Sequence, residues 1–115
     1  MVRVARVYEP PSADDGARVL VDRLWPRGLR KDAAHLDDWC KEVAPSNELR
    51  AWYGHDPERF KEFERRYKQE LHDPERREAL SRLKTRAKSE PMTLLTATHD
   101  FEISHAAVLA KMLGR

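Results

Sequence analysis

The chain alternates between short apolar runs and longer amphipathic stretches, a pattern typical of an α/β protein. Residues 2–8 are rich in β-branched side chains and predict a first strand. Residues 17–22 form a second apolar run that ends in Asp22, and residues 92–97 form the clearest strand candidate of the chain. Such continuous apolar runs are typical of strands that are buried on both faces.

Helices are predicted between and after these strands. The motif Asp-Pro-Glu-Arg occurs at residues 56–59 and 73–76, and each copy predicts a helix start, because Asp suits the N-cap and Pro the first helical position. Ser46 is expected to cap a helix over residues 47–53, and a last helix is expected over residues 101–113. The inward-facing positions expected in the two Asp-Pro helices are Phe60, Phe63, Tyr67, Leu71, Leu80, Leu83 and Ala87.

Strands near both ends of the chain, with helices between and after them, predict one α/β domain over residues 1–115. We expect a small, mostly parallel sheet covered by helices. Residues 36–43 fit either a helix or a short strand. In parallel sheets, sites form where loops leave the carboxyl ends of the strands, so the loops at residues 22–31 and 98–100 are the expected functional region.

The charge balance, the cysteine count and the apolar runs of the chain limit the classes of function that we expect. Charged residues make up 37% of the chain, but 22 basic residues nearly balance 20 acidic ones, and the two signs are interleaved. This balance does not favour a dedicated nucleic-acid-binding protein. The single cysteine, Cys40, excludes an internal disulfide and is expected to fill core space. The chain shows neither a signal peptide nor an apolar run of membrane-spanning length, so we expect no membrane association and a cytoplasmic location.

The run Asp-Arg-Leu-Trp-Pro-Arg-Gly at residues 22–28 is a distinctive motif that points to a known family. Together with Trp39, the Ala-Pro-Ser of residues 44–46 and Trp52, it resembles the YeaO-like branch of the domain-of-unknown-function family 488. The resemblance covers essentially the whole chain. It implies a compact α/β fold and no particular reaction.

The chain also departs from the wider family that it resembles. Relatives in a longer branch of that family carry a cysteine next to a histidine in the region that corresponds to residues 96–105. Here Ser104 precedes His105, and the region contains no cysteine. A mechanism that depends on such a cysteine is therefore not expected for this protein.

The loop over residues 22–28 carries the side chains that are best suited to binding a ligand. Arg23 and Arg27 can form a two-point fork for phosphate or carboxylate, and Gly28 allows close approach of the backbone to a ligand. Trp25 and Thr98 complete the predicted ligand-binding set. We therefore expect an anionic small molecule, either phosphorylated or carboxylated, at the carboxyl ends of the strands.

Three residues are candidates for proton transfer at this site. Asp22 at a strand end can orient an arginine or act as a base, and His99 and His55 are imidazoles, the side-chain type most often used for proton transfer. The alternative is a purely structural role, in which Asp22 and Arg23 form a buried ion pair and Trp25 fills the core.

Neither a metal nor a cofactor is expected. His99 and His105 are six residues apart, which does not place them on one helical face as metal ligands. The chain has only four glycines and no phosphate-binding or dinucleotide fingerprint.

A second hypothesis is a binding module for nucleic acid or protein, without catalysis. It requires the cations to share one surface. Those cations are Arg23, Arg27, Arg30, Lys31, Arg65, Arg66, Lys68, Arg82, Lys84, Arg86 and Lys88.

Overall fold

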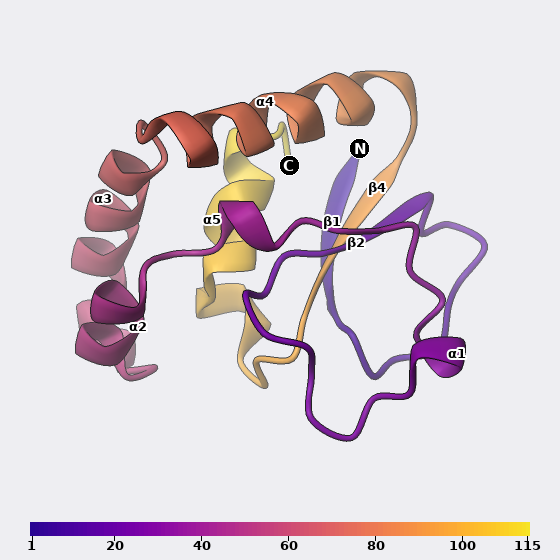
Figure 1. Ribbon diagram of the computed structural model, residues 1–115, viewed down its shortest axis with the longest axis horizontal. Helices are drawn as coiled ribbons and strands as arrows, with labels where there is room; N and C mark the ends of the chain where they lie inside the picture. The colour runs from indigo at the N-terminus through magenta and orange to yellow at the C-terminus, as the bar shows by residue number, and fades with distance from the viewer.

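The computed structural model describes residues 1–115 and confirms the α/β fold (Figure 1). The strands are β1 (Val2–Arg6), β2 (Ala17–Leu20), β3 (Asp38–Trp39) and β4 (Met92–Thr96). The α-helices are α1 (Lys31–Ala34), α2 (Asn47–Tyr53), α3 (Phe60–Glu70), α4 (Pro74–Ser89) and α5 (His105–Met112). Short 3-10 segments lie at Lys41–Val43, Pro57–Arg59 and Phe101–Ile103. No helix combines the length and the apolar character that crossing a bilayer requires.

The four strands form one parallel sheet in the order β1-β4-β2-β3. The last strand in the sequence, β4, lies at the centre, where Leu94 pairs with Val4 on one side and with Val19 on the other. All five residues of β4 are buried, as its continuous apolar run predicts. The sheet therefore forms only when the two ends of the chain come together.

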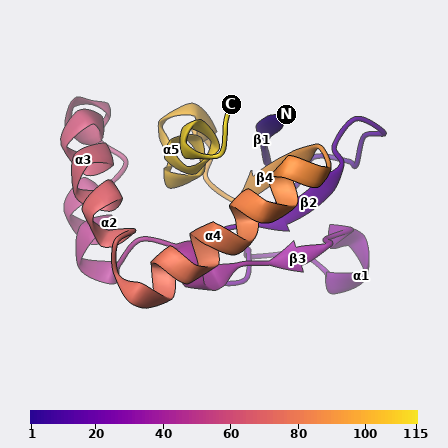
Figure 2. The same cartoon turned by 90° about the horizontal axis from the view of Figure 1, so that it is seen from above.

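The two faces of the sheet are covered differently. Successive strand residues point to opposite faces, so Val19 and Leu94 enter the main core, while Leu20 and Leu95 enter a smaller cluster with Val7. Figure 2 shows α2, α3 and α5 on one side of the sheet and α1 on the other. Helices thus cover mainly one face, and the long segment between β2 and β3 covers the second.

The helix starts largely follow the predicted caps. Ser46 Oγ accepts a hydrogen bond from the Leu49 amide at 3.1 Å, and Asp56 Oδ1 accepts one from the Glu58 amide at 3.0 Å. The chain after Asp56 begins with a 3-10 turn that leads into α3. Asp73 precedes α4 without a side-chain cap bond.

Two segments differ from simple expectations. Residues 36–43 contain both a two-residue strand and a 3-10 turn, because only Asp38 and Trp39 reach the edge of β2. The predicted last helix is interrupted at Ser104, whose backbone is extended. This break makes His105 the first residue of α5, where it faces the end of β2.

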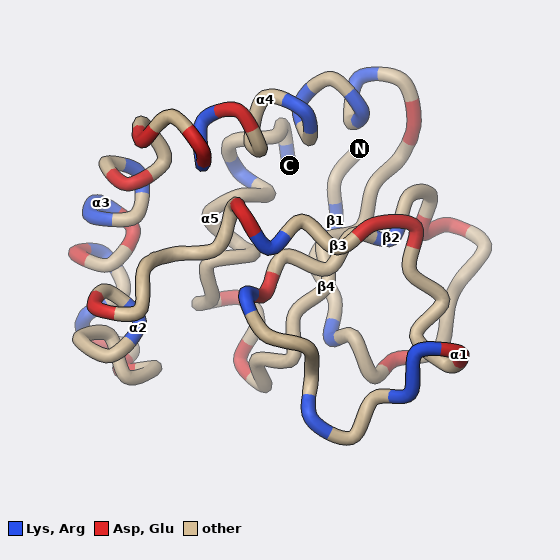
Figure 3. The backbone as a smooth tube through the Cα atoms, viewed as in Figure 1, with Lys and Arg blue, Asp and Glu red and all other residues tan.

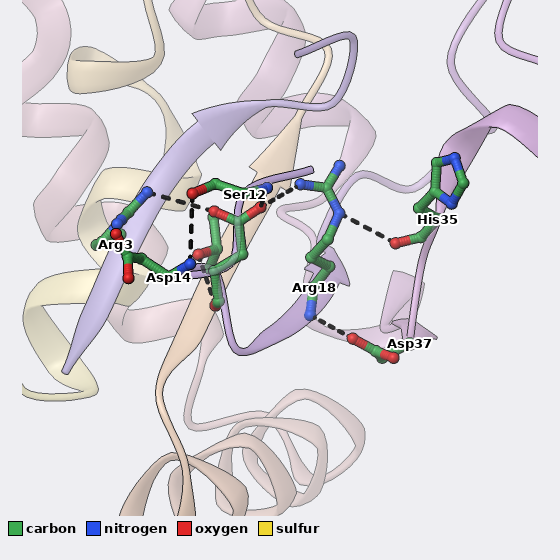
Figure 4. A network of polar contacts seen from close by, with 8 residues as sticks. Arg3, Ser12, Asp14, Arg18, His35 and Asp37 are labelled. Carbon is green, nitrogen blue, oxygen red and sulfur yellow. Dashed lines mark hydrogen bonds and ion pairs between the residues drawn. The ribbon is translucent and has the colours of Figure 1, made fainter. Parts of the chain in front are cut away.

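A buried charge network anchors the loops on the second face (Figure 4). Arg18 Nη1 lies 2.6 Å from Asp15 Oδ2, and Arg18 Nε donates to the His35 carbonyl at 3.0 Å. The Arg18 amide donates to Asp37, and Arg3 adds a second cation 3.3 Å from Asp15. Arg18 of β2 thus holds both the loop before β2 and the segment before β3 in place.

Candidate ligand-binding cleft

A cleft of about 270 Å³ lies at the carboxyl ends of β2 and β4. Its walls come from the loops that follow these two strands, from the start of α5 and from the region of α2. The two loops lie side by side because β2 and β4 are parallel neighbours in the sheet (Figure 1). The structure thus brings together the two loops that the sequence indicated.

Asp22 is the largely buried carboxylate of this cleft. Its Oδ1 accepts a hydrogen bond from Thr96 Oγ1 at 2.8 Å, and its Oδ2 accepts one from the Ala97 amide at 2.8 Å. Burial by itself raises the pKa of Asp22, but the contacts with His105, Ala97 and Thr96 outweigh it and leave that pKa below its ordinary value. Asp22 therefore stays ionised, with its oxygens directed at donors of the fold.

His105 connects α5 to the end of β2. Its Nε2 lies 3.0 Å from the Val21 carbonyl oxygen and 3.3 Å from Asp22 Oδ1. A carbonyl and an ionised carboxylate only accept hydrogen bonds, so Nε2 carries the hydrogen. The ring also packs edge-on against Tyr67, with 6.2 Å between the centroids. The orientation of the imidazole is fixed by these three neighbours.

Three arginines with free guanidinium groups line the cleft. Arg23 and Arg27 come from the loop after β2, and Arg50 comes from α2. None of their side chains forms an ion pair or a hydrogen bond. Every other arginine except Arg77 of α4 is bonded to an acidic side chain or, for Arg6, to a backbone carbonyl. The cleft thus holds three of the four arginines whose side chains have no partner in the chain.

Two tryptophans shape the loop after β2. Trp39 Nε1 donates to the Asp22 carbonyl at 2.7 Å, and Trp25 Nε1 donates to the Leu29 carbonyl at 2.7 Å. The two rings meet edge-on, and their centroids are 5.3 Å apart.

The prediction of a buried Asp22–Arg23 ion pair is wrong, because Asp22 bonds to other groups and Arg23 is exposed. Trp25 nevertheless has a structural role, because its ring packs against that of Trp39.

Comparison with known proteins places the chain in a family. A family model described as "Inactive DUF488-N3 subclade" matches residues 1–115. The chain belongs to the DUF488 family. This confirms the resemblance that the motif at residues 22–28 carries.

Its relatives span nearly the same length. The chain is 56% identical over 113 residues to an uncharacterized protein of Mycobacterium tuberculosis (strain ATCC 25618 / H37Rv), covering 98% of this chain and 93% of the relative. It is 41% identical over 114 residues to the uncharacterized protein YeaO of Escherichia coli (strain K12), covering 97% and 96%. No solved structure matches the chain.

In this DUF488 protein, most of the predicted site residues line the cleft. They are Asp22, Arg23, Trp25, Arg27, His55 and Thr98. Gly28 has a φ of 76° but lies outside the lining, and open space surrounds the position that a Cβ would take there. His99 also lies outside; its side chain is 86% exposed and contacts Asp100.

Several lining residues of the DUF488 cleft were not part of the predicted site. Arg50 and Tyr53 come from α2, whose position against the sheet no local pattern reveals. Ser104 and His105 enter through the break before α5. The adjacent Ser-His pair was visible in the sequence, but only the packing of α5 places it beside Asp22. No three His, Cys, Asp or Glu side chains are arranged to hold a metal ion.

The basic residues of this chain do not gather on one surface. In Figure 3 the blue segments are spread over α3, α4 and the loop after β2, with red segments among them along both helices. Most cations of α3 and α4 named above are also paired with acids: Arg65 and Arg66 with Glu62, Lys68 with Glu64, Arg82 with Glu42 and Arg86 with Glu90. This arrangement does not favour a nucleic-acid interface.

Proposed function

We propose that this protein binds a small anionic molecule in the cleft and does not transform it. The observation that carries the proposal is the set of three unpaired arginines, Arg23, Arg27 and Arg50, around one concave site. Guanidinium groups bind carboxylates and phosphates in a two-point geometry. Because these arginines come from two sides of the cleft, an anion between them would neutralise charge that the protein itself leaves uncompensated.

The polar groups deeper in the cleft support binding over catalysis. Asp22 accepts hydrogen bonds from the fold and has a lowered pKa, so it is a weak base. The Ser104 hydroxyl donates to the Phe101 carbonyl at 2.7 Å and has no base that would activate it. The description of the matching family model as inactive agrees with this interpretation.

The test is a thermal-shift and calorimetric comparison of the wild type with the double variant Arg23→Ala/Arg27→Ala. The probes are inorganic phosphate, glycerol 3-phosphate, lactate and citrate at constant ionic strength, which controls for general screening. We expect at least one probe to stabilise the wild type, and its affinity to fall by a factor of about ten or more in the double variant, since charge-assisted hydrogen bonds are lost.

The matched control is Arg77→Ala, which removes the other unpaired arginine, outside the cleft. It should bind the same probe as the wild type does. The proposal fails if no anion binds the wild type, or if the double variant and the Arg77 control lose affinity equally.

A further inference from the structure

The imidazole of His105 presents one occupied and one free nitrogen. Nε2 is held as a donor by the Val21 carbonyl and by Asp22, as described above. In a neutral imidazole the other nitrogen is then an acceptor. Nδ1 of His105 makes no hydrogen bond within the chain.

Nδ1 also keeps access to solvent. The one fully buried side-chain nitrogen or oxygen without a partner is Arg6 Nε, so Nδ1 of His105 is not sealed inside the protein. His105 lines the cleft. The acceptor nitrogen thus belongs to a residue of the cleft wall, is oriented by the fold and has contact with solvent.

The neighbouring hydroxyl groups of the protein do not satisfy this acceptor. Tyr53 donates to the Ile103 carbonyl at 2.6 Å, and Ser104 donates to the Phe101 carbonyl. Tyr67, whose ring touches His105, donates to the Val43 carbonyl. These three hydroxyl groups are therefore already used, and Nδ1 is left to accept a hydrogen bond from water or from a donor on a bound ligand.

We propose that the ligand carries a hydroxyl or N–H donor beside its anionic group, and that His105 Nδ1 accepts a hydrogen bond from it. This inference rests on the proposed function, because the arginines would hold the anionic end. The ligand class is then hydroxy acids or phosphate esters of polyols, in preference to simple carboxylates or alkyl phosphates. His105 is the residue that determines this specificity.

The experiment compares pairs of probes that differ by one or two hydroxyl groups. Glycerol 3-phosphate is paired with propyl phosphate, and lactate with propionate, and dissociation constants are measured by calorimetry at pH 8. One added hydrogen bond is expected to make the hydroxylated member of a pair bind roughly fivefold more tightly.

The matched variant is His105→Gln, whose amide can donate from the Nε2 position but has no acceptor at the Nδ1 position. It should bind propyl phosphate like the wild type and lose the preference for glycerol 3-phosphate. A second readout avoids any effect of the substitution on folding: in ¹⁵N spectra of the wild type, the unprotonated ring nitrogen of His105 should shift with glycerol 3-phosphate and stay in place with propyl phosphate.

The outcomes separate the two proposals. Equal binding of both members of a pair, or a preference that survives in His105→Gln, overturns the role of His105 and leaves anion binding intact. Absence of binding to the wild type by these four probes and by inorganic phosphate and citrate overturns both.

Discussion

Asp22 Oδ1 lies 3.3 Å from His105 Nε2, and this contact joins the end of β2 to the first residue of α5. The same carboxylate accepts hydrogen bonds from Thr96 and Ala97 at the end of β4. One side chain therefore ties together three of the elements that border the cleft. We therefore expect the shape of the cleft to depend on Asp22 remaining ionised.

Replacing Asp22 by asparagine should destabilise the protein. The amide has only one oxygen, so its NH₂ group would face a donor that Asp22 now satisfies, at a cost of about 1–3 kcal/mol. The free energy of unfolding in urea measures this. Asp14→Asn is the control, because Asp14 is an exposed acid of similar size; an equal loss in both variants would contradict the special role of Asp22.

The contribution of Asp22 should also depend on pH. Its pKa lies below the ordinary value of 3.8 in the folded state, so the unfolded chain takes up the proton more readily. The stabilisation is therefore present above the unfolded pKa and is lost as the pH falls through the folded pKa. The difference in unfolding free energy between the wild type and Asp22→Asn should be constant near neutral pH and shrink below about pH 4. A difference that grows on acidification would refute this.

Arg18→Met tests the network on the second face of the sheet. The side chains of Arg18 and Asp15 are both more than nine-tenths buried, so removing the cation leaves a buried carboxylate whose remaining partners are the Ser12 amide and the partly exposed Arg3. A loss of about 3–5 kcal/mol in unfolding free energy is expected. Arg30→Met, which breaks an exposed pair with Asp32, should have no measurable effect. Similar small losses in both variants would show that the network contributes little.

Two glycines with similar backbone angles should respond differently to alanine. Gly16 has a φ of 63°, and a Cβ there would lie 2.0 Å from the Pro91 carbonyl oxygen, so Gly16→Ala forces β2 away from the chain that enters β4. Gly28 has a φ of 76° with open space around it, so Gly28→Ala should cost only about 1–2 kcal/mol of backbone strain. The midpoint temperature of thermal unfolding should be clearly lower for Gly16→Ala than for Gly28→Ala. The reverse order would contradict the close approach of Gly16 to Pro91.

The thiol of Cys40 should be unreactive in the folded protein. It is 2% exposed, and burial raises its pKa to about 11, so almost no thiolate is present at pH 8. Alkylation by iodoacetamide, followed by mass spectrometry, should be slow in buffer and fast in urea. Rapid labelling of the native protein would indicate that the segment around β3 opens readily.

Local sequence patterns were sufficient to predict much of the fold. The apolar runs predicted β1, β2 and β4, and Ser46 and Asp56 form the side-chain caps predicted for them. The motif at residues 22–28 identified both the family and one wall of the cleft. These features depend on side chains close together in sequence, where periodicity, capping and turn chemistry act directly.

The sequence by itself therefore determined the α/β class, the principal strands and helices, and the loops at the carboxyl ends of β2 and β4. Tertiary structure alone decided that β4 lies between β1 and β2, that α2 brings Arg50 to the cleft, and that His105 meets Asp22. It also decided that Arg23 stays free of Asp22. These relationships join residues far apart in the chain, and packing against a shared core sets them, which no local pattern records.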